Sequence, residues 1–387
     1  MTKNITPSIK YIGVDDTTLD LFESQYIVPN GISYNSYLIL DEKVAIMDTV
    51  DCRMSEEWHT NLINALNGRT PDYLIVHHME PDHAGNIAMI LSYYPKLKIV
   101  ATIKAIAMLP QFFEDVDFNG RTIAVNEYEK LPLGSRSLQF FMAPMVHWPE
   151  VMITYDSTDK VVFSADAFGK FGILSFDDDW DNEARRYYFN ICGKYGIPVQ
   201  TFLKKITTLD IKHICPLHGP ILSENLEYYI GLYDTWSKYE AETDGVFIAY
   251  ASIHGNTKTA VLELAKILTK KGAKVVAITD LSRNDMSEAI ENAFRYGRMI
   301  VAASSYDGDV FPPMFDFLHH LKLKAYQRRR VAIIENGSWA PSAGRVMKEM
   351  LGKMKDLEII EPTVTLLSTM KQTDITAMET LANAILK

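Results

Sequence analysis

Cysteine is scarce in this chain, and its three cysteines lie far apart. Cys52, Cys192 and Cys215 form no Cys-x-x-Cys pair, which excludes both a rubredoxin-type iron site and a disulfide framework. The sequence also lacks an apolar run long enough to span a membrane. We therefore expect three buried, reduced thiols and no membrane partner, and the cytoplasm is the default location.

Two nucleotide-binding fingerprints are missing as well. Neither Gly-x-x-x-x-Gly-Lys-Ser/Thr nor Gly-x-Gly-x-x-Gly occurs, so we expect neither an ATP loop nor a dinucleotide site. The net charge of −10 argues against nucleic acid as a partner and favours solubility. A chain of 387 residues with 47% apolar and 23% charged residues is typical of a globular protein with two or three domains.

The most informative stretch runs from His78 to His83 and holds four potential metal ligands, His78, Glu80, Asp82 and His83. It follows the apolar run 73–76, which predicts a buried strand. The segment after it, from residue 83 or 84 to 94, predicts a helix. The ligands therefore occupy a turn at the carboxyl end of a strand, where open α/β folds place their sites. Such a turn can aim two ligands one way and two another, which suits two metals better than one.

Three further candidate ligands also follow predicted strands. His147 comes after Phe140-Phe141-Met142, Asp166 after Val161–Ala165, and His218 after Ile214–Leu217. Any one of them alone is more often a core or turn residue than a ligand. Together with the turn they complete the set that a two-metal site needs, in which one carboxylate lies between the metals.

The first half of the chain alternates short strands with polar turns and a few helices. Residues 37–40 and 44–47 predict a hairpin. Residues 55–66 predict a helix that ends near Gly68, a candidate C-cap. The pattern is a mixed αββα arrangement rather than a simple βαβ repeat.

The second half begins after a polar segment at about 235–245, and we expect the domain boundary near Asp244. Beyond it the pattern changes to regular strand-helix alternation, which predicts a doubly wound parallel sheet. The expected strands are 246–251, 274–278, 299–303, 330–334 and 357–362. The expected helices are 257–270, 286–296, 313–321, 344–351 and 373–386.

Three loops of this second half follow strands and predict one binding site at their shared edge. In the first loop, hydroxyls and backbone N–H groups at a helix N-terminus can hold a phosphate without a basic residue. An ordinary N-cap turn is the alternative. Tyr306 and Trp339 could stack on or edge a flat ring. The candidate residues are Ser252, Ile253, His254, Gly255, Asn256 and Thr257; Ser304, Ser305, Tyr306, Asp307 and Gly308; and Gly337, Ser338, Trp339 and Ala340.

The stretch 78–83 resembles the His-x-His-x-Asp-His motif of the metallo-β-lactamase-like superfamily, with Glu80 where zinc hydrolases carry the second histidine. A carboxylate there favours iron over zinc and redox chemistry over hydrolysis. With Tyr34–Tyr37, the stretch from His147 to Pro149 and the flavodoxin-type loop 252–257, nearly the whole chain resembles the flavodiiron proteins, also called A-type flavoproteins. That resemblance implies a metallo-β-lactamase-like αββα domain over 1–244 and a flavodoxin-like doubly wound parallel sheet over 245–387.

The resemblance also implies the cofactors, FMN and two irons in each chain. His78, Glu80 and His147 would bind one iron, and Asp82, His83 and His218 the other, with Asp166 bridging them. His83 is not a direct ligand in every family member.

The implied activity is that of an oxidoreductase. Electrons would pass from an external donor, expected to be a rubredoxin since no such domain is fused here, through FMN to the irons. There O₂ would be reduced to water or NO to N₂O, and the sequence does not favour either gas. A head-to-tail homodimer or a dimer of dimers is implied. The alternatives are a zinc hydrolase fused to a flavodoxin-like domain and an electron carrier with a binding module.

Several side chains near the predicted metal turn have two open interpretations. Tyr26, Trp148 and Tyr188 could line the pocket above the metals, or they could be packing aromatics. Arg185 and Arg186 are expected on a solvated helix face rather than on a substrate.

Overall fold

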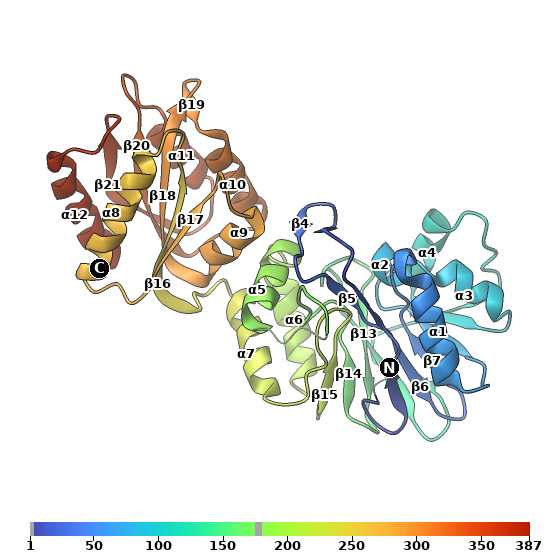
Figure 1. Ribbon diagram of the computed structural model, residues 1–387. Coiled ribbons are helices and arrows are strands. Elements are labelled where there is room, and N and C mark those ends of the chain that lie inside the picture. Colours follow the sequence, from blue (N-terminus) through green and yellow to red (C-terminus); the bar gives the residue numbers. More distant parts are fainter. Residues whose placement is uncertain (1–3, 175–179) are drawn as a thin grey trace. The chain divides into compact units, whose positions relative to one another are not determined.

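The computed structural model describes residues 4–174 and 180–387. The chain divides after Asp234 into two compact units, each of which is described by itself (Figure 1). The predicted domain limits, 1–244 and 245–387, stay a prediction, because compact units need not coincide with autonomously folding domains. Among the described helices, none combines the length and the apolar character needed to cross a membrane.

The first unit is built around two sheets. The first has the strand order β1-β6-β7-β8-β9-β10, and the second has the order β11-β12-β13-β14-β15. The strands of the first sheet are β1 (Ile9–Tyr11), β6 (Tyr37–Leu40), β7 (Val44–Met47), β8 (Tyr73–Ile75), β9 (Lys98–Thr102) and β10 (Thr122–Val125). Those of the second are β11 (Lys130–Pro132), β12 (Ser137–Met142), β13 (Met152–Asp156), β14 (Val161–Phe163) and β15 (His213–Cys215). Short ribbons β2 (Val14–Asp16) with β5 (Ile32–Tyr34) and β3 (Leu21–Phe22) with β4 (Tyr26–Ile27) complete the unit.

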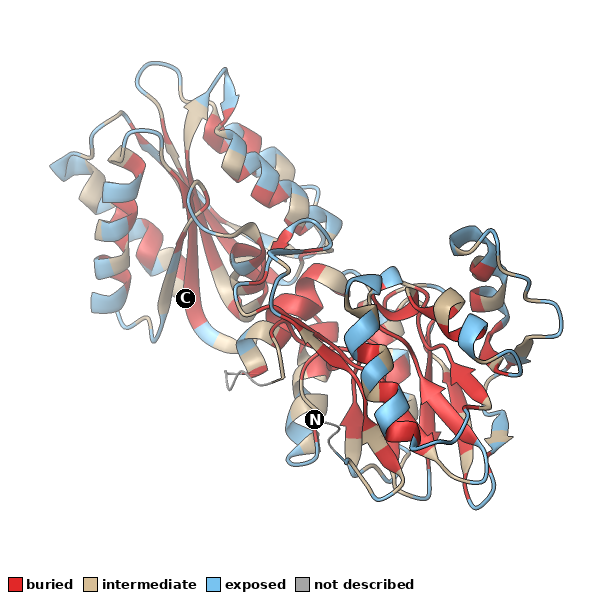
Figure 2. Ribbon diagram, turned by 45° about the vertical axis from the view of Figure 1, so that its right-hand side comes forward, coloured by how far each residue is buried: buried red, intermediate tan, exposed pale blue. Residues whose placement is uncertain are grey.

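Apolar side chains from both sheets meet in one core layer, which includes Tyr37, Met47 and Ile75 from the first sheet and Phe140 and Phe163 from the second. A second core lies between the first sheet and the helices outside it. Those helices are α1 (Ser55–Leu66), α3 (Ile87–Tyr93) and α4 (Ile103–Phe112). Helices α5 (Trp180–Ile191) and α6 (Gly196–Ile206) lie on the side of the second sheet, followed by α7 (Leu226–Ser237) (Figure 1). The result is the expected αββα layering, and burial follows it (Figure 2).

Local predictions in this unit are confirmed with two corrections. The hairpin of β6 and β7 and the helix α1 have the predicted bounds. The left-handed residue that caps α1 is Asn67, with Gly68 following it in the same conformation, because asparagine tolerates that region almost as well as glycine. The predicted helix over 83–94 is two helices, α2 (Pro81–Ala84) and α3.

The break between α2 and α3 has a packing cause. Pro81 starts α2 one turn earlier than expected, since proline is preorganised for the first helical position. At Gly85 a Cβ atom would lie 2.7 Å from the Pro81 carbonyl oxygen and 2.9 Å from the Cys52 nitrogen. The chain therefore presses against the segment before α1 at this glycine. As a consequence, Asp82 and His83 project from a helix rather than from an irregular turn.

The second unit is a parallel sheet with the order β17-β16-β18-β20-β21, the flavodoxin-like order. Its strands are β16 (Thr243–Ala251), β17 (Val276–Asp280), β18 (Tyr296–Tyr306), β20 (Arg329–Asn336) and β21 (Leu357–Leu366). Its helices are α8 (Asn256–Lys270), α9 (Met286–Arg295), α10 (Pro312–Leu323), α11 (Ala343–Leu351) and α12 (Gln372–Leu386). All the predicted strands and helices are confirmed; β19 (Asp309–Val310), which pairs antiparallel with β18, was not predicted.

Candidate functional site

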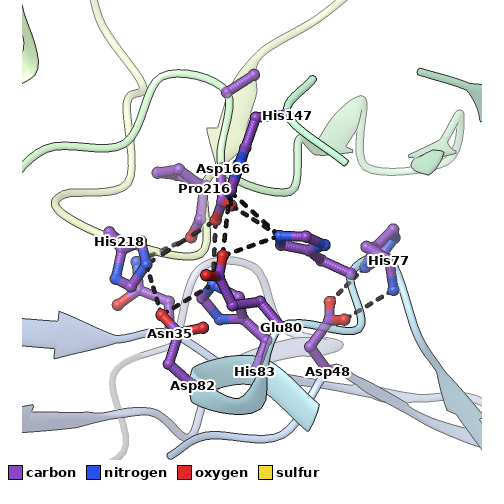
Figure 3. A network of polar contacts seen from close by, with 12 residues as sticks. Asn35, Asp48, His77, Glu80, Asp82, His83, His147, Asp166, Pro216 and His218 are labelled. Atoms are coloured by element: carbon purple, nitrogen blue, oxygen red, sulfur yellow. Dashed lines mark hydrogen bonds and ion pairs between the residues drawn. The ribbon is translucent and has the colours of Figure 1, made fainter. Parts of the chain in front are cut away.

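The predicted metal ligands gather at one edge of the first unit, where strands of both sheets end (Figure 3). His78 and Glu80 follow β8, and α2 carries Asp82 and His83. His147 lies beyond β12, Asp166 beyond β14 and His218 beyond β15. Four separate segments thus converge, the stretch 78–83 and three single residues, so a local pattern shows only the first of them.

The seven side chains form two groups, and within each group the possible ligand atoms lie within 4.8 Å of one another. One group is His78, Glu80, His147 and Asp166, and the other is Asp82, His83 and His218. Each group combines imidazole nitrogens with carboxylate oxygens. In the second group, for example, Asp82 Oδ2 lies 3.2 Å from His218 Nε2 and 3.4 Å from His83 Nε2.

Asp166 faces both groups with different oxygens. Its Oδ2 lies 3.1 Å from His147 Nε2 and 3.4 Å from His78 Nε2. Its Oδ1 lies 3.1 Å from His83 Nε2 and 3.9 Å from His218 Nε2. One carboxylate that divides its oxygens between two clusters has the geometry of a bridging ligand.

The cluster contains buried polar atoms without hydrogen-bond partners among the described residues. Both carboxylate oxygens of Asp82 and of Asp166, both ring nitrogens of His83, and Nε2 of His218 are of this kind. Buried polar atoms are normally satisfied, and exceptions commonly mark a ligand or ion site. The donor set of imidazole and carboxylate therefore fits two metal ions, with hard oxygen ligands that suit iron.

The electrostatics of the cluster agree with that fit. Burial alone would lower the pKa of His78, but Asp166 and Glu150 raise it well above its ordinary value. Burial would also lower the pKa of His147, but the carboxylates of Asp166 and Glu80 raise that pKa to about 9. Conversely, the imidazoles hold the pKa of Asp166 well below its ordinary value despite burial. The carboxylates of the site are thus ionised and attract positive charge, which a metal cation would supply.

Two groups outside the predicted set orient the ligands. Glu150 accepts from Nδ1 of His78 at 2.8 Å and from the backbone N–H of Met79 at 3.0 Å. Nδ1 of His218 donates to the carbonyl of Ser33 at 2.7 Å. Ligating histidines are commonly held in this way by a second hydrogen bond. Glu150 was overlooked, although a carboxylate three residues after His147 at a strand end is a recognisable candidate.

Of the three predicted pocket aromatics, Trp148 contacts the cluster, with its ring 5.1 Å from that of His78. Tyr26 instead packs on Phe171 and donates its hydroxyl to the carbonyl of Asn190. Tyr188 is fully buried and packs edge-on against its neighbour Phe189. The packing interpretation therefore describes Tyr26 and Tyr188.

Phe22, which was not predicted, closes the other side of the cluster, with its ring 5.4 Å from that of His218 at 88°. No local feature of the sequence predicts this contact.

Arg185 and Arg186 are not on a solvated face, so that expectation is wrong. Both are buried. The Arg186 guanidinium lies 4.4 Å from the centre of the Phe171 ring and donates to the carbonyl of Ile27 at 3.0 Å, in β4. An aromatic face, a strand carbonyl and the carboxylate of Glu183, at 2.9 Å on the same helix, thus stabilise the buried charge of Arg186. Phe171 and Ile27 come from segments distant in sequence, which helical charge patterning does not reveal.

The second unit contains a cavity of about 590 Å³ at the carboxyl ends of β16, β18 and β20, a size within the usual range for small-molecule sites. All three predicted loops line it, with every predicted residue except Gly255. Asn336, which begins the predicted third loop, lines it too, as do Ser342 and Ser368, which were not predicted. Ser368 follows β21, so the same strand-end argument could have found it.

The floor of this cavity is the N-terminus of α8. Gly255, the N-cap residue of α8, has φ of 88° and makes no side-chain cap, while Ser252 Oγ accepts from the N–H of Lys258 in the first turn at 3.3 Å. The other N–H groups at the start of α8 are therefore suited to an anion. The Thr257 and Ser304 hydroxyls lie 3.1 Å apart beside it. At the rim, Trp339 is 90% exposed and Tyr306 46%, so both rings are open to a flat ligand. A phosphorylated aromatic cofactor fits this arrangement.

Comparison with known proteins gives matches to a family model, to relatives in sequence and to solved structures. A family model described as "ODP family beta lactamase" matches residues 32–219. An anaerobic nitric oxide reductase flavorubredoxin of Vibrio vulnificus is 28% identical over 350 residues, which cover 88% of this chain and 70% of that protein.

Solved structures share the whole fold. A rubredoxin oxygen:oxidoreductase from Desulfovibrio gigas superposes with a TM-score of 0.93 at 23% identity, covering 100% of this chain and 98% of that chain. A flavodiiron protein from Giardia intestinalis gives 0.90 at 22% identity, with 100% and 95% covered. The fold is therefore a metallo-β-lactamase-like unit followed by a flavodoxin-like unit.

Proposed function

We propose that the chain is a flavodiiron oxidoreductase that passes electrons from an external donor through FMN to a pair of irons, where O₂ is reduced to water or NO to N₂O. Its similarity to such proteins in sequence and in fold supports the proposal. The observation that carries the proposal is the division of the two Asp166 oxygens between the two ligand groups.

The donor set favours iron redox chemistry over zinc hydrolysis. Glu80 occupies the position where the resembling zinc hydrolases carry a histidine, and its carboxylate lies 3.1 Å from His147 Nε2 and 3.2 Å from His78 Nε2. An added carboxylate supplies a hard, negative ligand, which stabilises the higher oxidation state of iron. The zinc hydrolase alternative is not favoured for this reason.

The residue roles follow from the two groups. His78, Glu80 and His147 would hold one iron, and Asp82, His83 and His218 the other, with Asp166 between them. Glu150 and the Ser33 carbonyl fix the orientation of the His78 and His218 rings. Trp148 and Phe22 cover the cluster with apolar rings, which limits the access of water. When bound, the iron pair would supply the binding and reduction of the gas.

In the second unit, the N-terminus of α8 and the hydroxyls of Ser252, Thr257 and Ser304 would hold the FMN phosphate. Ser252 Oγ also accepts from the N–H of Gly255 at 3.1 Å, which keeps the loop in place. Tyr306 and Trp339 would lie against the flavin ring. The cavity has one phosphate-binding terminus, which favours FMN over FAD.

The names of the relatives bear on substrate and donor. One is called a nitric oxide reductase and another a rubredoxin oxygen:oxidoreductase, so both gases belong in the proposal. We propose rubredoxin as the donor and a head-to-tail homodimer as the working assembly. The cytoplasmic location stays a prediction.

The test is metal and flavin content followed by turnover. Purified protein should carry about two irons per chain and releasable FMN, identified by mass spectrometry. After anaerobic reduction it should consume O₂, NO or both. Stoichiometric zinc without iron, in cells supplied with both metals, would reject the redox proposal.

A further inference from the structure

One buried histidine beside the metal cluster has no part in the proposed ligand set. His77 is 1% exposed, and its neighbours Asp48 and Thr154 are equally buried. Its backbone N–H donates to Asp48 Oδ1 at 2.7 Å, and its Nδ1 contacts Asp48 Oδ2 (Figure 3). Its Nε2 lies 2.7 Å from Thr154 Oγ1. Because a carboxylate faces Nδ1, that nitrogen donates to Asp48, and Nε2 is hydrogen-bonded to the Thr154 hydroxyl.

These contacts join the two sheets of the first unit. Asp48 follows β7 of the first sheet, and Thr154 lies on β13 of the second. The carbonyl of His77 accepts from the N–H of Met152 at 3.2 Å, at the start of β13. The His77 ring also stacks on Phe163 of β14, with centres 6.4 Å apart and planes at 19°.

His77 follows β8 and contacts β13 and β14, and these three strands lead to or from the candidate ligands of one metal. His78 and Glu80 follow β8 directly after His77, while the loop before β13 carries His147 and Glu150. Asp166 follows β14.

The second metal group has other anchors. The carbonyl of His83 accepts from both the N–H and the hydroxyl of Thr49, at 2.9 and 2.5 Å. The His218 ring is held by the carbonyl of Ser33. Neither anchor passes through the His77 ring, although Thr49 directly follows Asp48 in the chain.

We propose that His77 is a positioning residue for one metal of the pair: its bond to Thr154 fixes the relative positions of His78, Glu80 and His147, whereas Asp82, His83 and His218 are positioned without it. The inference rests on the proposed function, because it assumes that both groups hold iron. An ordinary packing histidine would affect folding but would not distinguish the two metals.

The test uses two variants that break the same bond from opposite ends. In His77→Asn the side-chain amide still reaches Asp48 but not Thr154. In Thr154→Val the hydroxyl is replaced by a methyl group of similar size, so this variant should fold even if the first does not. The measurement is anaerobic titration of metal-free protein with Fe(II) against a chelator, with iron counted per chain.

Each variant should bind one iron with wild-type affinity and the other about 10 to 100 times more weakly, the usual cost of losing an orienting partner. The double variant should bind the weak iron no more weakly than either single variant, since both remove one interaction. Thr154→Ser, which keeps the hydroxyl, should restore wild-type binding. His59→Asn, on the outer helix α1 where the ring stacks on Tyr93, is the matched control.

Wild-type affinity for both irons in His77→Asn and Thr154→Val would overturn this inference alone. Equal weakening of both irons would do the same, since it would mean general disruption. A wild-type chain that binds no pair of irons would overturn the proposed function and, with it, the inference.

Discussion

Single residues in the metal cluster balance charge in the absence of solvent. His78, Asp166 and His218 are fully buried, and a buried charge is tolerated only when it is paired. In this cluster the pKa of the His78 imidazole is raised and that of the Asp166 carboxyl is lowered, each against the effect of burial and mainly by charges of the opposite sign nearby. A metal ion would take the place of the protons on the imidazoles, so metal binding and proton release should be coupled.

Glu150→Gln tests the hydrogen bond to His78. Glutamine keeps the size of the side chain but removes the negative charge that faces Nδ1 of His78. We expect iron affinity at the His78 group to fall by about 10- to 100-fold, as measured by chelator competition. Glu129→Gln, at an exposed position of the same unit, is the control, and equal affinities in both variants would remove Glu150 from the site.

The effect of pH on the stabilisation by iron follows from the protonation of His147. Its pKa in the metal-free fold is raised to about 9, above its value of about 6.5 in the unfolded chain. Its protonation therefore stabilises the metal-free fold fully below pH 6.5, and this contribution is lost as pH rises through 9. Iron must displace that proton, so the increase in melting temperature on iron binding should grow between pH 6.5 and 9. Paired melting curves of metal-free and loaded protein check this, and an increase that shrinks with pH would contradict it.

At the scale of helices and strands, both candidate sites lie where parallel strands end. In the second unit, β16, β18 and β20 run parallel, so their following loops share one edge. The helix α8 starts at that edge and directs its N-terminus into the cavity. Three loops and one helix terminus thus build the site, and the sheet holds them in register.

Trp339→Ala tests the rim of that site. The side chain is 90% exposed, so its removal should leave the melting temperature of the FMN-free protein unchanged. Loss of a stacking contact worth about 0.5–1.5 kcal/mol should weaken FMN retention about 2- to 13-fold or shift its reduction potential.

Fluorescence titration with FMN and a redox titration measure both quantities. Ile197→Ala removes another exposed apolar side chain, from the first unit, and serves as the control. If the affinity and potential of Trp339→Ala match the control, Trp339 has no role in flavin binding.

The whole molecule carries its two candidate sites in separate units, whereas fast electron transfer needs the cofactors close together. We propose that a head-to-tail homodimer brings the FMN of one chain to the irons of the other, in a closed two-fold assembly. This assembly should be visible as a dimer or a dimer of dimers by light scattering.

Complementation tests the exchange of electrons between chains. One variant lacks the irons through Asp82→Ala and Asp166→Ala, and the other lacks FMN through Thr257→Glu and Trp339→Ala. Each should be inactive alone, and mixed dimers should recover part of the activity through their one intact pairing. Verified subunit exchange without recovered activity, or an active monomer, would contradict the cross-chain relay.

Local sequence determined which elements form and where the ligands lie along them. Apolar runs of strand length and their polar ends predicted β8, β14 and β15, and strand-helix alternation predicted the parallel sheet of the second unit. The ligand types in the stretch from His78 to His83 were also evident, because a turn after a buried strand has few structural reasons to hold so many charged groups.

Tertiary structure alone decided how these elements meet. The two oxygens of Asp166, the bond from His78 to Glu150, and the position of His77 between three strands depend on segments far apart in the sequence. The burial of Arg186 against Phe171 and β4 has the same origin. Periodicity and turn chemistry act over a few residues, whereas these contacts are set by the packing of two sheets, so the sequence indicated the candidate ligands and the fold determined their geometry.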